Sequence, residues 1–299
     1  LFTSRILPAI ALLYYIFPAF LMMTACVKGI DPADKAGVNP RGQSVLNINL
    51  MHSGSLKSVT SGTMDIFVFN DDRLKRLDSY QRFTGESTNG VTAASRKGRK
   101  IVAAVINSGK EKSDWAGINS LDALLKTVVE LGDEDPAYPV MCGMTEVNMG
   151  EENECVLAVS PMISEIYIRS IRCDFSGTSY PNEKLKLVRI YLTNVNGRAR
   201  LFDKSGFMPE QIINGGRLSE ADMSAMLHPE MLLKETDMNI GYGTAYPEIR
   251  LCCFPNDCRE ESPGSPFTRL VIEGKVRGMT YYYPIEINRE EISASGEAG

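Results

Sequence analysis

The sequence predicts an all-β protein built from two tandem β-sandwich domains. Short runs rich in β-branched and aromatic residues recur along the chain, and Gly, Pro, Asn and Asp separate them. In the first run, Leu46, Ile48 and Leu50 alternate with more polar positions, as expected of a strand that buries one face. Pro161 interrupts the strand pattern between two later runs and therefore marks the expected domain boundary.

Further strands are expected in order along the chain. Apolar or alternating runs occupy residues 44–51, 64–69, 100–107, 154–160, 164–171, 184–192, 248–254, 267–276 and 279–287. They divide into an N-terminal sandwich, 44–160, and a C-terminal sandwich, 161–299. In the last run, Tyr281, Tyr282 and Tyr283 would alternate between faces, and at least one face is expected to lie in the core.

Two short helices are expected in the connections. In the segment 119–132, Asn119 or Ser120 is the expected N-cap and Gly132 the stop, and the apolar side chains of one face are Leu121, Leu124, Leu125 and Val128. In the segment 219–230, Ser219 is the expected N-cap, with Asp222 at the third helical position.

The N-terminal segment, residues 1–25, has the features of a lipoprotein signal peptide. Arg5 precedes an apolar stretch that reaches Ala25, and the small residue before Cys26 is the junction that lipoprotein signal peptidase accepts. Cys26 would then be lipidated and tether the mature chain to a membrane. A retained membrane span is the alternative, because the stretch is also long enough to cross a bilayer. Residues 26–43, which contain Pro and Gly, are expected to form a flexible spacer.

Charge and cysteine content narrow the functional classes. The 299-residue chain has a net charge of −5 with scattered Lys and Arg, which argues against nucleic acid as a partner. Seven cysteines are too few for a disulfide scaffold at this length. Cys253 and Cys258 flank a turn-like segment and could form a disulfide, but small buried thiols are the preferred interpretation. A zinc site is disfavoured because no second cysteine pair or histidine cluster accompanies them.

The sequence contains no recognisable catalytic constellation, and no cofactor or metal is expected. His52 and His228 are far apart and neither lies near a nucleophile pattern, so His228 is expected to lie at a helix end in a capping or solvent-exposed position. The acidic stretch from Asp133 to Asp135 is expected to be solvated loop charge. Trp115, Tyr180 and the tyrosines near the C-terminus are the residue types that stack on sugars.

Several stretches together resemble the fimbrillins, the subunits of type V pili of Gram-negative anaerobes. They are "MDIFVFNDDRLKRLDSYQRF", "GRKIVAAVINS", "PVMCG", "VRIYLTNV" and "PFTRLVIEGKVRGMTYYYPIEIN", in this order, together with the lipoprotein junction at Cys26. The resemblance covers about residues 44 to 288. It implies two tandem transthyretin-like Greek-key sandwiches, export as an outer membrane lipoprotein, and assembly with other fimbrial subunits by exchange of β-strands at the cell surface.

The resemblance also implies a processing site. In structural subunits of the family, a trypsin-like protease removes the first strand and opens a groove that a neighbouring subunit fills. The corresponding strand here contains Leu46, Ile48 and Leu50, and the basic residue of the following linker, "HSGSLKSVTSG", is Lys57, where the best-known members have arginine. An ordinary first strand that stays in place is the alternative.

The C-terminal segment differs from the family pattern. After "YYYPIEIN" the family continues into a donor strand, whereas this sequence continues with the polar "REEISASGEAG". Either the donor strand is missing or this subunit does not donate, so acceptor, terminal and anchoring roles stay open. Surface receptors of host or bacterial cells are further expected partners. The alternatives are a non-polymerising pilus anchor and, from a different class, a surface glycan-binding lipoprotein; a hydrolase would need a polar cluster that the sequence does not reveal.

Overall fold

The computed structural model describes residues 43–52, 62–85, 90–150, 154–203, 211–242, 245–246, 248–256 and 266–287. Cys26, Lys57 and Cys258 lie outside these ranges, as do the predicted signal peptide and the segment 288–299. The predicted all-β class is confirmed, because strands dominate the described residues. The tandem Greek-key arrangement stays a prediction.

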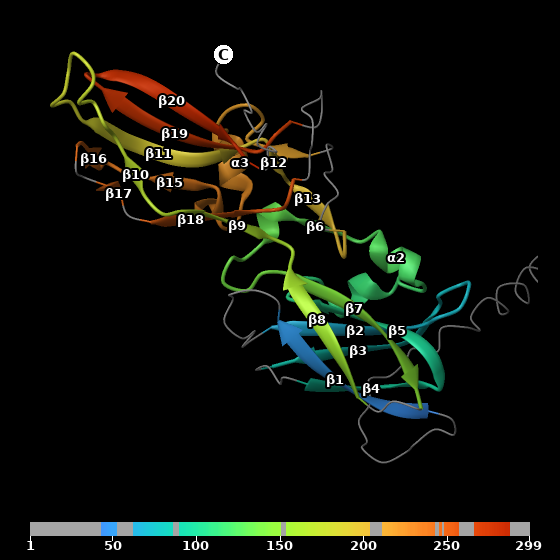
Figure 1. Ribbon diagram of the computed structural model, residues 1–299. Coiled ribbons are helices and arrows are strands. Elements are labelled where there is room, and N and C mark those ends of the chain that lie inside the picture. Colours follow the sequence, from blue (N-terminus) through green and yellow to red (C-terminus); the bar gives the residue numbers. More distant parts are fainter. Residues whose placement is uncertain are drawn as a thin grey trace, which may run out of the picture. The chain divides into compact units, whose positions relative to one another are not determined.

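The N-terminal strands form one seven-stranded sheet with the order β3-β2-β5-β7-β8-β1-β4 (Figure 1). In chain order these strands are β1 (Gln43–His52), β2 (Thr63–Asn70), β3 (Leu77–Thr84), β4 (Gly90–Arg96), β5 (Gly98–Ile106), β7 (Met141–Met149) and β8 (Glu154–Pro161). The β7–β8 ladder contains only the pairs Met141–Pro161 and Cys142–Ser160. The sheet therefore changes direction at this corner, and its two parts can enclose a core.

Side chains from both parts of this sheet share one hydrophobic core, the N-terminal core. Leu46 and Ile48 of β1 lie in it together with Ile66 of β2, Val102 of β5 and Leu157 of β8. Burial of this apolar surface is the dominant favourable contribution to folding of the sheet. The alternation predicted for the first strand places these side chains correctly.

Strands β2 and β5 are buried on both faces, which explains their nearly continuous apolar sequences. Their second face packs in another core that also includes Trp115 of η1 (Lys112–Trp115) and Leu124 of α2 (Leu121–Leu125). Phe67 contacts Trp115 in an edge-to-face arrangement with ring centroids 5.2 Å apart.

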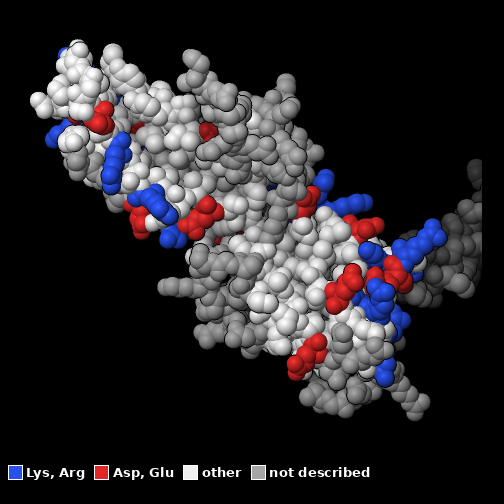
Figure 2. Space-filling view, in the orientation of Figure 1, with Lys and Arg blue, Asp and Glu red and all other residues white. Residues whose placement is uncertain are grey.

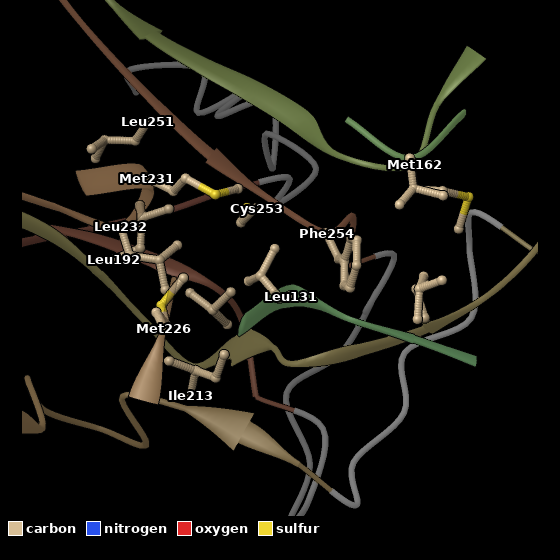
Figure 3. Close-up of a cluster of buried hydrophobic side chains, with 14 of the residues drawn as sticks. Leu131, Met162, Leu192, Ile213, Met226, Met231, Leu232, Leu251, Cys253 and Phe254 are labelled. Atoms are coloured by element: carbon tan, nitrogen blue, oxygen red, sulfur yellow. The ribbon is translucent and has the colours of Figure 1, made fainter. Parts of the chain in front are cut away.

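The C-terminal strands form a five-stranded sheet with the order β15-β11-β19-β20, and β16 pairs with β11 beside β15. These strands are β11 (Leu185–Thr193), β15 (Leu233–Glu235), β16 (Asn239–Ile240), β19 (Arg269–Val276) and β20 (Met279–Glu286). Two-stranded pairs accompany this sheet: β9 (Ser164–Ile168) with β18 (Ile249–Cys253), β10 (Ile171–Arg172) with β17 (Ala245–Tyr246), and β12 (Val195–Asn196) with β14 (Ile212–Ile213). Leu192, Leu251 and Phe254 pack together in the core shown in Figure 3.

The predicted boundary near residue 160 coincides with the junction of β8 and β9. However, β6 (Val128–Glu130), from the N-terminal side, pairs with β13 (Arg198–Arg200) from the C-terminal side. Leu131 and Leu192 also belong to the same core. The described residues belong to one compact unit, and the division into 44–160 and 161–299 stays a prediction.

Both predicted helices are shorter than expected, and the second ends at Ala225 rather than near residue 230. Helix α2 begins after the predicted cap Ser120, whose Oγ accepts a hydrogen bond from the Ala123 N–H at 3.4 Å, but it ends at Leu125. The prediction that it continues to Gly132 is wrong, because β-branched residues at 127–129 lead into β6 and the short η2 (Leu131–Asp133). Helix α3 (Glu220–Ala225) begins as predicted, with Ser219 as its cap.

Cys253 is a free thiol buried in the core of Figure 3, as the preferred interpretation of the cysteines required. Burial is the main cause that raises the pKa of this thiol, to about 12, so it stays protonated at neutral pH. Among the described residues, no group of His, Cys, Asp and Glu side chains is arranged to hold a metal ion. No helix in the described ranges has the length and apolar character of a membrane span.

Gly143 allows the close approach at the β7–β8 corner. A Cβ atom at this position would lie 1.9 Å from the carbonyl oxygen of Ala158 on β8. We expect Gly143→Ala to lower the free energy of unfolding by at least about 2 kcal/mol, because backbone would have to move. The matched control is Gly117→Ala, which meets nothing within 4 Å. Urea unfolding of both variants measures the difference, and equal stabilities would contradict this account of the corner.

Candidate functional site

Strand β1 lies between two strands from later in the chain (Figure 1). It runs antiparallel to β4, with the register Gln43–Arg96 to Asn49–Gly90, and parallel to β8, with the register Asn47–Glu154 to His52–Val159. The middle of β1 is therefore hydrogen-bonded on both sides. This central position in a sheet is what the exchanged strand of the prediction requires.

The side chains of β1 alternate between the core and the outside. Leu46 and Ile48 are 0% exposed, and Leu50 is half-buried against the same core. Val45 and Met51 face outward and are exposed. Full burial of Leu46 and Ile48 contributes about 3–6 kcal/mol in total, at about 1.5–3 kcal/mol for each side chain. The strand is thus held by a few apolar contacts and by main-chain hydrogen bonds, and no disulfide bond among the described residues attaches it to the sheet.

Departure of β1 would expose an apolar groove. Its walls would be Val91 and Ala93 of β4 and Leu157 and Val159 of β8, all of which are buried in the N-terminal core. The main-chain N–H and C=O groups that β1 now satisfies on β4 and β8 would be left unpaired along the groove. Another extended segment with the same apolar alternation would fill the apolar groove and would pair these main-chain groups.

Strand β4 has no ladder partner except β1 among the described residues. A buried carboxylate provides its other attachment. Asp78 of β3 accepts hydrogen bonds from the Ser95 hydroxyl at 2.5 Å and from the Arg96 main-chain N–H at 2.9 Å. Asp78 also pairs with the Lys100 Nζ of β5 at 3.0 Å. The network joins β3 and β4, the two outermost strands of the sheet, and would keep β4 in place without β1.

The carboxyl group of Asp78 is held in its ionised form. Burial alone would raise its pKa, but hydrogen bonds from Ser95, Arg96 and Lys100 outweigh this effect, and the pKa lies well below its ordinary value of 3.8. Lys100 is itself buried and contacts Asn70 Oδ1 at 2.5 Å. This network is a functional feature that the sequence reasoning missed.

A second buried carboxylate, Asp65, attaches η1 to the face of β2 that lies away from the N-terminal core. Its oxygens accept hydrogen bonds from the Tyr80 hydroxyl at 2.7 Å and the Trp115 Nε1 at 3.0 Å, and Arg82 pairs with it at 2.8 Å. Burial and the hydrogen bond to Asp65 raise the pKa of Tyr80. Trp115 is buried in this arrangement, so its ring is not available to stack on a sugar.

Glu134 corrects the prediction that the stretch from Asp133 to Asp135 is solvated. Its side chain is buried beside a cavity of about 820 Å³, and burial, with smaller effects of Asp135 and Asp133, raises its pKa to about 7 although the Val140 N–H opposes the rise. Its Oε2 accepts that hydrogen bond at 3.1 Å, whereas its Oε1 is shielded and has no partner among the described residues. We assign Glu134 a structural role in closing the turn before β7.

The remaining aromatic and histidine candidates lie at the surface. Tyr281, Tyr282 and Tyr283 are 39%, 58% and 44% exposed, so the expectation that one face of this strand lies in the core is wrong. Tyr180 is exposed beneath the guanidinium of Arg277. His228 is the N-cap residue of η3 (Pro229–Met231), and its Nδ1 lies 2.8 Å from Glu230. It therefore lies at a helix end, as predicted.

Charges of both signs are interspersed on the described surface in Figure 2, with uncharged areas between them. Arg250 pairs with Glu165, for example, and Arg99 with Asp71. The described residues on the face shown in Figure 2 therefore do not form the continuous basic stripe that a nucleic acid backbone needs.

Comparisons with known proteins locate the fold. No protein-family model matches the chain, and no curated protein matches it by sequence. Among solved structures, a proposed cell adhesion protein from Parabacteroides distasonis is similar at 12% identity and a TM-score of 0.60, covering 82% of this chain and 80% of that one. A fimbrilin from Porphyromonas gingivalis W83 matches at 12% identity and 0.56, covering 82% and 81%. The C-terminally truncated tip fimbrial protein Mfa3 of P. gingivalis matches at 14% and 0.51, covering 82% and 81%.

The chain thus has the fold of bacterial fimbrial and cell adhesion proteins. The resemblance to the fimbrillins, drawn from the sequence, is confirmed at the level of the fold, and it extends over more than four-fifths of the chain. Cys26 and Lys57 lie outside the described residues, so their roles stay predictions.

We expect Asp78→Asn to lower the free energy of unfolding by about 3 kcal/mol at pH 7, because it leaves the buried Lys100 without its anionic partner. Since the pKa of Asp78 is lowered by folding, the stabilisation is complete above the unfolded value near 3.8 and is lost as the pH falls below it. Urea unfolding at pH 7, 4 and 3 should show the difference from wild type shrinking with pH. Asp122→Asn, at an exposed position, is the matched control. A pH-independent difference would contradict the electrostatic explanation.

Proposed function

We propose that this protein is a non-catalytic fimbrial subunit that is exported as a lipoprotein, assembles at the cell surface by β-strand exchange and supports adhesion. The observation that carries the proposal is the position of β1, which fills an apolar groove between β4 and β8 with Leu46 and Ile48. The fold of known fimbrial and adhesion proteins supports the same class.

The groove suits strand exchange because β1 can be replaced without rebuilding the rest of the sheet. Both neighbours of β1 have attachments that do not involve it. Strand β8 pairs with β7 at the corner, and β4 is hydrogen-bonded to Asp78 through Ser95 and Arg96. An incoming strand needs two or three apolar side chains at alternate positions and a free main chain.

Proteolysis at Lys57 would supply the trigger. Lys57 falls between the end of β1 at His52 and the start of β2 at Thr63, so a cut there separates β1 from the rest of the fold. Cys26 lies on the same side of the cut as β1. One cleavage would therefore open the groove and release the remaining chain from its lipid tether.

The proposed location is the outer membrane and then the fimbrium. Lipid chains on Cys26 would hold the uncleaved precursor at the membrane. Other fimbrial subunits are the proposed partners, and surface receptors of host or bacterial cells the proposed targets. If Lys57 is not cleaved in the cell, the same geometry describes a non-polymerising anchor that keeps both its first strand and its lipid.

We expect trypsin to cut the folded protein after Lys57 without unfolding the remainder. The nicked protein should then bind a fluorescent peptide with the sequence of residues 43–52, because the displaced strand leaves the groove between β4 and β8 open. Intact protein should not bind it. Fluorescence polarisation after limited digestion and removal of the released fragment measures this difference.

Two controls sharpen the exchange experiment. Lys57→Gln should resist the cut and stay unable to bind, and a peptide with aspartate in place of both Leu46 and Ile48 should bind at least about a hundredfold more weakly, since two apolar side chains are lost. Resistance of the wild type at Lys57 would favour a permanent first strand. Long homopolymers of nicked protein alone would contradict the expectation that this subunit does not donate a strand.

We expect the mature chain to begin at a lipidated Cys26. Cells fed radiolabelled palmitate should label the wild-type protein, and Cys26→Ala should abolish both the label and partition into the detergent phase. The variant Cys155→Ala is the control for nonspecific labelling of cysteine. A labelled Cys26→Ala protein would contradict the lipoprotein assignment.

A further inference from the structure

A second cavity lies on the C-terminal sheet, far in sequence from the groove of β1. It has a volume of about 560 Å³, within the roughly 300–1,000 Å³ of small-ligand pockets. Its floor consists of side chains that alternate along two neighbouring strands, Tyr191 and Thr193 of β11 and Val271 of β19. The loop at Arg217 and Leu218 and the strand β20 supply its sides.

The charges in this cavity are predominantly positive. Three arginines line it, Arg189, Arg217 and Arg269, against one acidic residue, Glu273. The carboxylate of Glu273 is buried and already accepts from Arg189 at 2.5 Å and 3.4 Å, so it does not oppose an incoming anion. This bidentate pair instead fixes the Arg189 side chain along the floor.

Arg217 is the cation that this arrangement leaves available. It is exposed, and among the residues that the structure describes it has no ion-pair or hydrogen-bond partner. Arg269 lies on the same sheet face and pairs with Glu286 at 3.4 Å. A guanidinium group presents a planar pair of N–H donors that matches a carboxylate. The cavity therefore offers a carboxylate-binding group beside its apolar floor.

Tyr282 gives the cavity an aromatic wall. It stands opposite Glu273 in the β19–β20 register and is 58% exposed, whereas its neighbours Tyr281 and Tyr283 project from the other face of the strand. Pro284, opposite Val271, continues the same wall. An exposed aromatic ring combines a flat apolar face with a polar hydroxyl, which suits a ring-shaped ligand that carries hydroxyl groups.

We propose that this cavity is a binding site for an acidic saccharide, with the sugar ring against Tyr282 and the sugar carboxylate on Arg217. A simple inorganic anion would not use the aromatic wall, and a neutral sugar would leave the guanidinium group of Arg217 without a partner. An acidic peptide would supply a carboxylate for Arg217 but no sugar ring to lie against Tyr282. The combination of the two features in one cavity thus favours the saccharide.

This site is independent of strand exchange. None of its lining residues belongs to β1, β4 or β8. Uncleaved protein should therefore bind the saccharide as well as nicked protein, and a negative result would leave the proposed assembly mechanism untouched.

The test is saturation-transfer NMR and titration of the uncleaved protein with N-acetylneuraminic acid and with glucuronic acid. At least one of these acids should bind saturably, whereas galactose and a short acidic peptide should bind at least about tenfold more weakly, the loss expected when a charge-assisted contact or a stacking contact is missing. Equal binding of galactose, equal binding of the peptide, or failure of both acids would overturn the proposal.

Matched variants locate the site. Tyr282→Ala and Arg217→Ala should each weaken binding by about tenfold or more. Tyr281→Ala, on the opposite face of the same strand, and Arg73→Ala, at an exposed turn, should leave it unchanged. Because all four side chains are exposed or half-exposed, the variants should fold, and far-UV circular dichroism verifies this. Equal loss in the control variants would overturn the assignment of the ligand to this cavity.

Discussion

Strand β1 connects β4 to the rest of the N-terminal sheet through its ladder hydrogen bonds. Strand β4 pairs with no other strand among the described residues, so the first ten described residues of the chain hold in place a strand that begins almost forty residues later. The core side chains of β4 are small, Val91 and Ala93, and contribute little apolar surface of their own. Leu46 and Ile48 supply the larger part of the burial between β4 and β8.

Two buried carboxylates add polar contacts to the N-terminal sheet, and one of them, Asp78, holds the edge strand β4. Asp78 connects β4 to β3 and β5, and Asp65 fixes Trp115 against the face of β2 that lies away from the N-terminal core. Both are fully paired, which is the condition under which a buried charge does not destabilise a fold. Asp78 holds β4 by contacts that do not involve the apolar side chains of β1. If β1 is exchanged as proposed, these contacts would hold β4 in place while the groove is open to an incoming strand.

The sequence predicted most of the long strands with apolar runs, but it missed β3, β4 and β7, and it placed one face of β20 in the core although that strand is exposed. β1, β2, β5, β11 and β19 have alternating or continuous apolar runs, and all were expected. β3, with the sequence LDSYQRFT, and β4, with GVTAASR, carry polar or small side chains, because each is an outer strand of the sheet. The helix after Ser120 was predicted to continue to Gly132 because the apolar spacing of this segment also fits a strand. The strand that forms is β6, in which Val129 pairs with Ala199, 70 residues further along the chain.

Contacts between residues far apart in the sequence also limited the prediction of the sites. Leu46 and Ile48 were identified because alternation is a local property of the sequence, but Asp78 pairs with residues 17 to 22 positions away and Asp65 with one 50 positions away. Nothing local distinguishes these aspartates from solvated ones. The arginine-rich cavity arises in the same way, from the pairing of β11 with β19 and β19 with β20, which brings side chains from three separate segments to one face. Because the groove and the cavity are built on different sheets, the proposed assembly and the proposed ligand recognition can vary independently: substitutions in the cavity need not preserve the apolar alternation on which the strand β1 depends.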